Sequence, residues 1–556
     1  MATVRRLYSG FRGVDFRGEE VSLQRSPDSL NMWRCYKDVQ GIRTRPGLKL
    51  HTAFSQPVYG IYGFHGDLLV HSGTKLYRVA GAETQVLGEG LKAKKSCGFA
   101  YGDKWYFLDG EHYLCYDGET LAPVEGHIPT TSIGRAPLGG GKVLEDVNLL
   151  SDYRINTFSG DEGSRAFHLD TEGIDKDFWP VATENGEDAE VSGVDWDKGV
   201  VTLKTAPGKP QTPGQDNVSI KFKKHKPGNK EKILGCTLLQ IFDNRVFVAG
   251  NPGHPNTLWH SSLQDVSYFS DLDYYQEGLD NAPITGMVAG NNALWVFRAP
   301  GNAGTHVFYH TPTLDGDYGK IYPSVHSSVA VGCVGKAINF LDDMVFFSPR
   351  GMEGISGNIT TEQGVSHRSS MVDRKLLAEK GYRDMLLEEW EGYLMIFVGD
   401  KVFLADSRQV FTHEGHREYE FYYWQLEKTP ISTRVQDGVL YLGTEDGLYT
   451  LDEGVAVPSW WTTPADKFGQ PGLWKTMDGR PAIAEAQGAG LEISAKAAGE
   501  DRWTSVGIFD RVEDAAVFRV KKKKFKDLRL KFAASKGFSL ETVTVTAQVG
   551  GPLKRV

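Results

Sequence analysis

Residues 239–272 read LQIFDNRVFVAGNPGHPNTLWHSSLQDVSYFSDL, and this stretch predicts the fold of the chain. Asp243-Asn244 is a tight-turn pair, and valine takes every second place in residues 246–249, the period-2 pattern of a half-buried strand. Asn251-Pro252-Gly253 interrupts the pattern before a second apolar run starts at Leu258. The stretch therefore predicts strand, turn, strand, loop and strand.

The same unit recurs along the chain as a turn of Gly, Asp or Asn followed by an apolar strand. Further copies lie at residues 63–79, 101–118, 290–297, 341–347, 390–397 and 436–451. A strand unit that cannot bury both of its faces alone, and that recurs about every 40 to 50 residues, is typical of propeller blades. The sequence therefore predicts an all-β fold with a β-propeller of about seven blades, although six or eight blades fit the pattern as well.

The length of the chain and the changes in composition along it predict several domains. At 556 residues it is too long for one hydrophobic core, so roughly two to four domains are expected. We predict an N-terminal arm at 1–54, a propeller at 55–127 and 233–458, an inserted small β-sandwich at 128–232, and a C-terminal β-sandwich at 459–556. Short alternating strands indicate both sandwiches. Residues 369–380, followed by Gly381, are the one convincing helix candidate.

Charge and cysteine content narrow the class of protein. The net charge is −9 and the pI is about 6.0, so the chain as a whole does not have the charge of a nucleic-acid binder. The five cysteines have no metal-ligand spacing and are expected to be reduced, as in a cytosol. The start lacks the apolar segment of a signal peptide, and no apolar run reaches about 18 residues, so we expect no membrane span.

Three motifs resemble catalytic or metal-binding sites without matching them. His413 and His416 are three positions apart, whereas a zinc protease needs a spacing of four on a helix, so a polar surface turn is favoured. The acids at 271–273 and 315–317 lack the rest of a calcium loop, and residues 139–142 lack the frame of a phosphate-binding loop. We predict surface turns and a flexible linker at these places, with no catalytic, cofactor-binding or metal site.

The densest charge run is Lys521, Lys522, Lys523 and Lys524. On a strand edge such a run is solvated and blocks aggregation. In a ring of copies around DNA it would instead face phosphates or a subunit interface. The run at 221–226 has the same two interpretations, and Trp460-Trp461 favours packing between sheets over stacking on a sugar ring.

Asp243 and Arg245 flank the turn of the deciding stretch. We predict that both are structural, because they are placed to orient the blade turn and to pair with neighbouring backbone. No Ser-His-Asp arrangement and no nucleophile elbow stand out in the sequence. The chain is therefore expected not to be an enzyme.

Three stretches together resemble a known family. They are FRGVDF, SPDSLNMW and GIRTRPG in the arm (residues 11–47), residues 133–158 of the insertion, and residues 244–269. Their order is similar to that in bacteriophage tail-tube-end proteins, which include the packaged-DNA stabilisation and tail-nozzle proteins of short-tailed phages. The resemblance covers about half of the chain and brings no catalytic residues with it.

The resemblance implies a virion tail protein made in the host bacterial cytoplasm. Such a protein would assemble as a homo-oligomeric ring, expected to be a hexamer, below the portal or adaptor, and would contact other tail proteins. It would touch double-stranded DNA only transiently, which suits a mildly acidic chain because every phosphate contact adds affinity. It would need no cofactor.

The alternative function is a β-propeller that binds or cleaves glycans. A glycosidase needs two carboxylates placed by the fold, and the sequence does not single out two among its 71 acidic residues. A monomer that binds an oligosaccharide would favour this alternative over the ring.

Overall fold

The computed structural model describes residues 2–18, 21–37, 40–81, 83–302, 304–316, 319–355 and 365–552, and in these ranges β-strands dominate. The α-helices of the described ranges are short: α1 (Asn229–Leu234) and α2 (Asp373–Leu376). The prediction of an all-β chain is therefore confirmed. The chain divides into two compact units, Met1–Lys95 with Ser327–Val556 and Ser96–His326, which are described separately.

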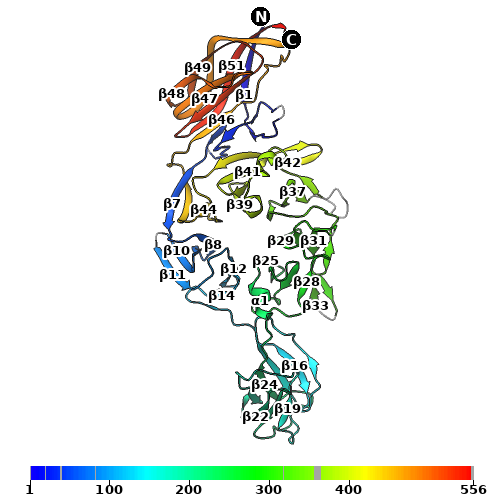
Figure 1. Cartoon of the computed structure of the whole chain (residues 1–556). Coiled ribbons are helices and arrows are strands. Elements are labelled where there is room, and N and C mark those ends of the chain that lie inside the picture. The colour runs from blue at the N-terminus through cyan, green and yellow to red at the C-terminus, as the bar shows by residue number, and fades with distance from the viewer. Residues whose placement is uncertain are drawn as a thin grey trace. The chain divides into compact units, whose positions relative to one another are not determined.

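The first unit contains groups of four antiparallel strands that follow the sequence repeats (Figure 1). The first group is β8 (Val58–Phe64), β9 (Asp67–Ser72), β10 (Lys75–Ala80) and β11 (Glu83–Glu89), and the second is β35 (Ala337–Phe340), β36 (Asp343–Ser348), β37 (Gly351–Ile355) and β38 (Val365–His367). The third is β39 (Leu386–Trp390), β40 (Tyr393–Val398), β41 (Lys401–His413) and β42 (His416–Gln425). The fourth is β43 (Ser432–Gln436), β44 (Val439–Gly443) and β45 (Gly447–Asp452) together with β7 (Gly47–Ala53). Strand β7 precedes the first repeat, yet it pairs with β45 of the last repeat. Strands from the two ends of the repeat region thus complete one sheet.

Neighbouring sheets of this unit pack through alternate side chains. The odd-numbered residues of β40 join one core together with Leu440 and Leu442 of β44. Its even-numbered residues join another core together with Val345 and Met352 of β36 and β37. Each side of the strand therefore serves a different neighbour, as expected when sheets are stacked face to face.

The second unit repeats this plan. Its four-stranded sheets are β12 (Cys97–Tyr101), β13 (Lys104–Leu108), β14 (Tyr113–Tyr116) and β15 (Leu121–Pro123); β25 (Leu238–Phe242), β26 (Arg245–Ala249), β27 (Thr257–His260) and β28 (Tyr274–Gln276); and β29 (Ile284–Gly290), β30 (Ala293–Arg298), β31 (Val307–His310) and β34 (Ser324–His326). A hairpin of β32 (Thr313–Asp315) and β33 (Gly319–Ile321) lies between β31 and β34 in the chain. The deciding stretch of the sequence thus forms three strands of the second sheet, β25, β26 and β27, and the fourth strand follows it.

Strand β26 is buried on both faces, so the prediction of a half-buried strand is wrong. Val246 and Val248 join a core with Phe99 of β12, whereas Phe247 and Ala249 join a second core with residues of β30. The pattern of alternation is correct, but both sets of side chains are covered because a sheet packs on each side.

The insertion between β15 and β25 consists of two sheets around a core of its own (Figure 1). One contains β17 (Lys142–Val143), β16 (Thr130–Arg135), β18 (Tyr153–Phe158), β24 (Val218–Lys223), β20 (Val181–Glu184) and β21 (Glu187–Ala189), and the other β19 (Ala166–His168), β23 (Val200–Leu203) and β22 (Val191–Asp195). Phe158 of the first sheet meets Phe167 of the second edge to face, with ring centroids 5.2 Å apart. Aromatic contact across the two sheets is what closes this core.

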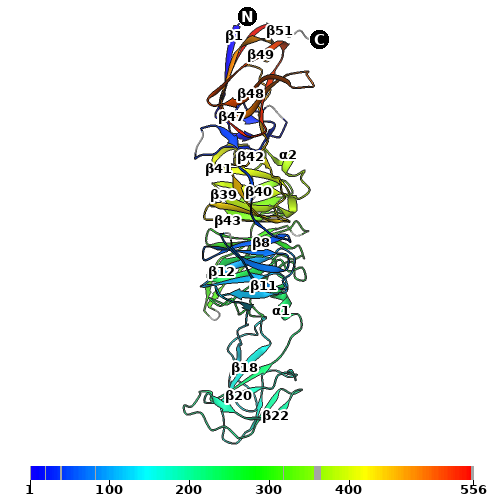
Figure 2. The same ribbon diagram turned by 90° about the vertical axis from the view of Figure 1, so that its left-hand side faces the viewer.

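A C-terminal module follows, defined as residues 459–552 together with β1 (Ala2–Ser9). Its strands are β46 (Ser459–Thr462), β47 (Leu473–Ala497), β48 (Thr504–Val512), β49 (Ala515–Phe525), β50 (Leu528–Ala534) and β51 (Phe538–Pro552). The first half of β47 pairs with β49 and β51, and its second half pairs with β48 and β50. β1 extends the first of these sheets beside β51 (Figure 2).

Strand β47 changes sheets at its glycines. Its buried residues have even numbers from Ala482 to Ala486, and from Leu491 onwards they have odd numbers, with Ser494 buried as well. Between them, Gly490 has a φ of 66°, which glycine adopts at no steric cost. This shift of register keeps both halves of the strand facing the shared core.

The arm contributes strands to several sheets. Its elements are β2 (Gly13–Val14), β3 (Arg25–Ser26), β4 (Ser29–Leu30), β5 (Met32–Trp33) and β6 (Ile42–Thr44). β4 pairs with β46, β5 pairs with β42, and β6 pairs with both β5 and β51. The arm is therefore part of the sheets of the first unit and not only a cover over them.

The predicted helix at 369–380 is wrong in length, since α2 has only four residues. The Ser369 hydroxyl and His367 both bind the carboxylate of Asp373, and these bonds hold the start of α2 against β38. The Glu379 amide then bonds the carbonyl of Leu376, a tight turn that ends the helix. Helix α1 was not predicted; it follows Gly228, whose φ is 83°.

Candidate functional site

Asp243 and Arg245, the two predicted turn residues, meet at Tyr322. Asp243 and Asn244 have φ values of 48° and 56° in the two-residue turn between β25 and β26. The Tyr322 hydroxyl donates a hydrogen bond of 2.7 Å to Asp243, and it accepts one of 3.0 Å from Nε of Arg245. Arg245 also donates to the backbone carbonyl of Ser261 at 3.1 Å.

Lys320 completes this group by pairing with Asp243 at 2.7 Å. Burial alone would raise the pKa of Asp243, but the hydrogen bonds from Lys320 and Tyr322 outweigh it and lower the pKa. The turn is thus fastened to the segment that precedes β34. The arrangement orients backbone and leaves no side chain of the group poised as a base.

A buried pair that the sequence did not indicate lies beside this group. Nε2 of His310 is 2.9 Å from Oε1 of Glu277, and both side chains are fully buried. The other carboxylate oxygen of Glu277 accepts a hydrogen bond of 2.6 Å from Ser324, and Nδ1 of His310 lies 2.8 Å from the carbonyl of Tyr322. These residues come from β31, β34 and the end of the β28 segment, so local patterns could not reveal them.

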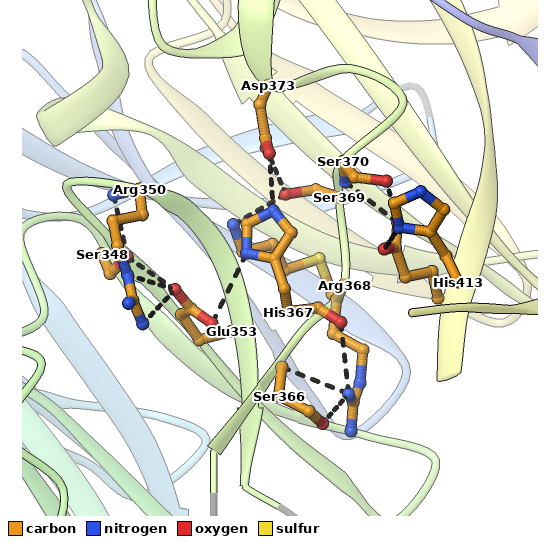
Figure 3. A network of polar contacts seen from close by, with 12 residues as sticks. Ser348, Arg350, Glu353, Ser366, His367, Arg368, Ser369, Ser370, Asp373 and His413 are labelled. Carbon is orange, nitrogen blue, oxygen red and sulfur yellow. Dashed lines mark hydrogen bonds and ion pairs between the residues drawn. The ribbon is translucent and has the colours of Figure 1, made fainter. Parts of the chain in front are cut away.

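A network of polar contacts in the first unit surrounds His367 (Figure 3). Nε2 of His367 is 2.5 Å from Asp373, and Nδ1 is 3.5 Å from Glu353. Burial alone would lower the pKa of His367, but bonding to Asp373 and Glu353 outweighs burial and raises it to about 10. At neutral pH the ring is therefore a cation that donates to both acids, and it has no free nitrogen to accept a proton.

Arg368 points from the same strand end into a second buried cluster. Its Nε and Nη2 bind the two carboxylate oxygens of Asp343 at 2.8 and 3.2 Å, and Nη1 donates to the backbone carbonyl of Arg417 at 3.2 Å. Tyr419 donates to the same aspartate at 2.7 Å. Arg368 and Asp343 are 3% and 8% exposed, so this bidentate pair is withdrawn from water.

A third cluster fastens the arm to β42. Arg25 holds the buried carboxylate of Glu420 with two hydrogen bonds of 2.6 and 2.8 Å. Burial raises the pKa of Glu420, and the bonds from Arg25 partly offset that rise. Arg17 pairs with Asp15 and also contacts Nε2 of His413 at 3.1 Å. The arm is therefore anchored by charged groups that the fold buries.

The other motifs are placed as turns. His413 and His416 face each other across a two-residue hairpin whose turn is Glu414-Gly415. Residues 139–142 form the hairpin between β16 and β17, where Gly140 accepts a hydrogen bond of 2.6 Å from Arg135, so they lie inside the insertion and are not a linker into it. Asp271 lies in a turn after β27, and Asp317 lies outside the described residues.

The lysine runs differ in their contacts. On β49, Lys522 binds both carboxylate oxygens of Glu500 at 2.6 and 2.8 Å, whereas Lys521, Lys523 and Lys524 are exposed. In the run at 221–226, Lys221 lies 4.9 Å from the ring centroid of Tyr153, and further lysines pair with Asp177 and backbone carbonyls. Trp461 is buried against Phe11 at 5.4 Å between ring centroids.

Two cavities lie within single units. One, of about 530 Å³, lies in the first unit, and its lining includes Arg43 and Glu453, which form an ion pair. The other, of about 450 Å³, lies in the second unit and is lined by residues that include Tyr101, Tyr106 and Asp265. Asp265 accepts hydrogen bonds from the amide and hydroxyl of Ser267, so this acid caps a turn.

Across the described ranges, no three histidine, cysteine or acidic side chains are grouped so that they could hold a metal ion. In the same ranges no helix is long and apolar enough to cross a membrane.

No family model and no curated protein matches the sequence. Solved structures with propeller-like folds resemble the chain at low identity. BamB from Moraxella catarrhalis is 10% identical over 76% of this chain and 96% of its own, with a TM-score of 0.33. YCF48 bound to D1 peptide is 6% identical over 74% of this chain and 98% of its own, also with a TM-score of 0.33. Likeness at this level assigns no function.

Proposed function

We propose that this chain is a structural protein of a short-tailed phage virion. It would form the nozzle or stabilisation ring of the tail, below the portal or adaptor, where it helps to retain packaged DNA and then to channel it. In this proposal the seven groups of four strands are the blades of one propeller, and the insertion and the C-terminal module are two β-sandwiches.

The observation that carries the proposal is the construction of the arm, which holds the clearest family-like motifs. Their side chains bind the body of the first unit: Ser26 donates to the carbonyl of Thr462 at 2.7 Å, and Asn31 donates to that of Pro458 at 2.8 Å. Trp33 stacks on Trp390 at 5.4 Å between ring centroids. Residues 11–33 thus contact both the C-terminal module and the sheets of the first unit, which supports a structural role.

The chemistry of the buried clusters favours a non-enzymatic role. His367 is held as a cation between two acids, and Arg368 and Arg25 are each committed to a buried carboxylate. Groups fixed in this way stabilise a fold and do not exchange protons with a substrate at neutral pH. The exposed lysines of the run at 521–524 are the proposed place for contact with DNA or with another subunit.

An electron-microscopy experiment on particles tests the proposal. Virions that carry the chain with an affinity tag on the exposed hairpin at residues 139–141 are expected to show density for it in a collar below the portal. Particles produced without the chain are expected to lose packaged DNA, and supplying the intact chain should restore them. The proposal fails if purified particles lack the chain or if particles made without it keep their DNA and their tail.

The alternative, a glycan-binding propeller, is favoured by one observation. The cavity of the second unit carries two tyrosines beside acidic side chains, a lining that suits a sugar. Calorimetry with a panel of oligosaccharides separates the two functions. Binding to the wild-type chain that is lost in Tyr106→Ala but kept in Tyr274→Ala, at an exposed tyrosine elsewhere, would support the glycan-binding function; no heat of binding would remove it.

A further inference from the structure

A row of hydrogen-bond donors from three strands lines the cavity of the first unit. Gln487 of β47 lies opposite Ser539 of β51, and Ser539 lies opposite Arg43 of β6. All three residues belong to the lining of the cavity. Side chains directly opposite each other in an antiparallel sheet share a face, with Cβ atoms about 4.5–5.5 Å apart. We call these residues the donor row: an amide, a hydroxyl and a guanidinium stand in register across three strands.

Packing of the core fixes the direction in which the donor row faces. Each of its members has a buried neighbour on the same strand, and these neighbours are Ala486, Leu540 and Ile42. Successive side chains of a strand point to opposite faces, so the donor row faces away from this core and toward the cavity. The three donors are therefore placed by the fold before any ligand arrives.

The charged residues of the lining carry a net positive charge. They are Arg43, Arg45, Lys536 and Glu453. Arg45 is 2% exposed and is held by Glu427 at 2.8 Å and by backbone carbonyls, so this buried pair adds little charge to the cavity. Arg43 pairs with Glu453 at 2.9 Å, and Lys536 is exposed. The charge of Lys536 is thus left over, and the cavity favours an anion.

Glu453 already places one oxyanion on the donor row. Its carboxylate binds the guanidinium of Arg43, yet its side chain is 66% exposed, whereas that of Arg43 is 20% exposed. An ion pair whose acid is so open to water contributes little free energy. A ligand with a greater negative charge can therefore displace Glu453 and bind Arg43 in its place.

The size and the apolar part of the cavity indicate a ligand with an organic body. The volume is about 530 Å³, within the range of about 300–1,000 Å³ that is usual for sites of small organic molecules. The lining also includes Val455, Val457 and Phe538, and the last two are buried. An apolar body beside the anionic group would cover these side chains.

We propose that this cavity binds a small organic phosphate monoester. A monoester carries about 1.5 to 2 negative charges near neutral pH and has three terminal oxygens. These oxygens accept hydrogen bonds from Arg43, Ser539 and Gln487, and Lys536 neutralises the remaining charge. A carboxylate or a phosphodiester of the DNA backbone has one charge and two free oxygens, so either matches this set less well. The site goes beyond the virion role and does not depend on it.

Calorimetry on the full-length chain tests the ligand class. The probes are phenyl phosphate, inorganic phosphate and phenol. Phenyl phosphate is expected to bind more tightly than inorganic phosphate, because its ring adds apolar contact, and phenol is expected to give no heat of binding. A short DNA duplex is then added as a competitor. Displacement of phenyl phosphate by the duplex at an equal concentration of phosphate groups would overturn the assignment to a monoester.

Substitutions in the lining test the donor row, and circular dichroism verifies the fold of each variant. Arg43→Gln is expected to raise the Kd for phenyl phosphate at least about tenfold, because it removes charge-assisted hydrogen bonds. Ser539→Ala and Lys536→Gln are expected to raise it severalfold, and the exposed position of Lys536 keeps that change from disturbing the fold. Glu453→Gln removes the competing carboxylate and is expected to lower the Kd, a gain that a purely structural role would not produce.

Two controls match these variants in charge but lie away from the cavity. Glu513 is 75% exposed and pairs with Arg511 at 3.2 Å, and Lys198 is 77% exposed. Glu513→Gln and Lys198→Gln are both expected to bind phenyl phosphate like the wild type. The inference is overturned if phenyl phosphate gives no heat of binding, or if Arg43→Gln and Lys536→Gln both bind it like the wild type. It is also overturned if Glu513→Gln tightens binding as much as Glu453→Gln does, since net charge alone would then explain the effect.

Discussion

Two groups of charged residues in the first unit differ in almost every physical respect. The cluster of Arg368, Asp343 and Tyr419 is buried and fixed by paired hydrogen bonds. The run Lys521, Lys522, Lys523 and Lys524 has more charge in a shorter stretch, yet only Lys522 has a close acidic partner. Burial and pairing, and not the density of charge along the sequence, therefore decide which of the two stabilises the fold.

The largest effect is expected at the buried pair. Asp343→Ala would leave the Arg368 guanidinium in the interior without its carboxylate, and removing one partner of a buried pair costs about 3–5 kcal/mol. Thermal unfolding followed by circular dichroism should show a melting temperature lower by several degrees. If Asp343→Ala had the melting temperature of the wild type, the buried pair would not stabilise the fold more than the exposed lysines do.

A double variant sharpens this result. Asp343→Leu with Arg368→Met replaces both charges by apolar side chains, and such replacements are often neutral or stabilising. It should therefore melt above Asp343→Ala. If the double variant is instead the less stable of the two, the pair contributes more than the avoidance of an unpaired charge.

The next largest effect concerns His367 and depends on pH. Its folded pKa of about 10 lies above the ordinary value of about 6.5, so its charged form stabilises the fold fully below pH 6.5 and this contribution is lost as the pH rises toward 10. The difference in melting temperature between the wild type and His367→Gln should be largest near pH 6 and shrink steadily toward pH 10.

His416→Gln serves as the control, because this histidine lies exposed in the hairpin after β41, and its melting profile should follow the wild type at every pH. A constant difference between the wild type and His367→Gln from pH 6 to pH 10 would show that the charge of His367 has no part in stability.

The sequence predicted the strands well because the repeats combine turn residues with alternating apolar side chains. Asp243-Asn244 forms the expected turn, and residues 246–249 form the expected strand. The degree of burial could not be predicted, since whether Phe247 and Ala249 face water depends on a second sheet from elsewhere in the chain. The length of α2 was not predicted either, because the turn in which the Glu379 amide bonds the carbonyl of Leu376 ends the helix earlier than the sequence pattern indicates.

The sequence did not show which residues meet in the buried polar clusters. Asp243 and Arg245 could be singled out because they flank a turn, but their common partner Tyr322 lies 77 positions from Arg245. Arg25 and Glu420 are separated by 395 positions. A lysine run is visible in any sequence, whereas a buried pair of this kind becomes visible only when the fold brings its members together.

Arg245→Ala should have a smaller effect than either change in the buried clusters. It removes hydrogen bonds to the Tyr322 hydroxyl and the Ser261 carbonyl, each worth about 1 kcal/mol. The melting temperature should fall modestly. Tyr322→Phe, which removes the hydroxyl shared by Asp243 and Arg245, should cause a similar loss, and the two changes combined should cost less than their sum. Full additivity would mean that the two residues act independently.

The smallest effect is expected within the lysine run. Replacing Lys521, Lys523 and Lys524 together by Gln should leave the melting temperature within about 1 °C of the wild type, because exposed charges away from a partner contribute little. Lys522→Gln, a single change, should lower it more, since Lys522 is 14% exposed and holds both oxygens of Glu500. The triple variant would then lose less stability than the single variant, which would show that burial and pairing stabilise the fold more than the number of charges does. A large loss in the triple variant, measured on a monomeric sample, would mean that these lysines pack against the chain itself.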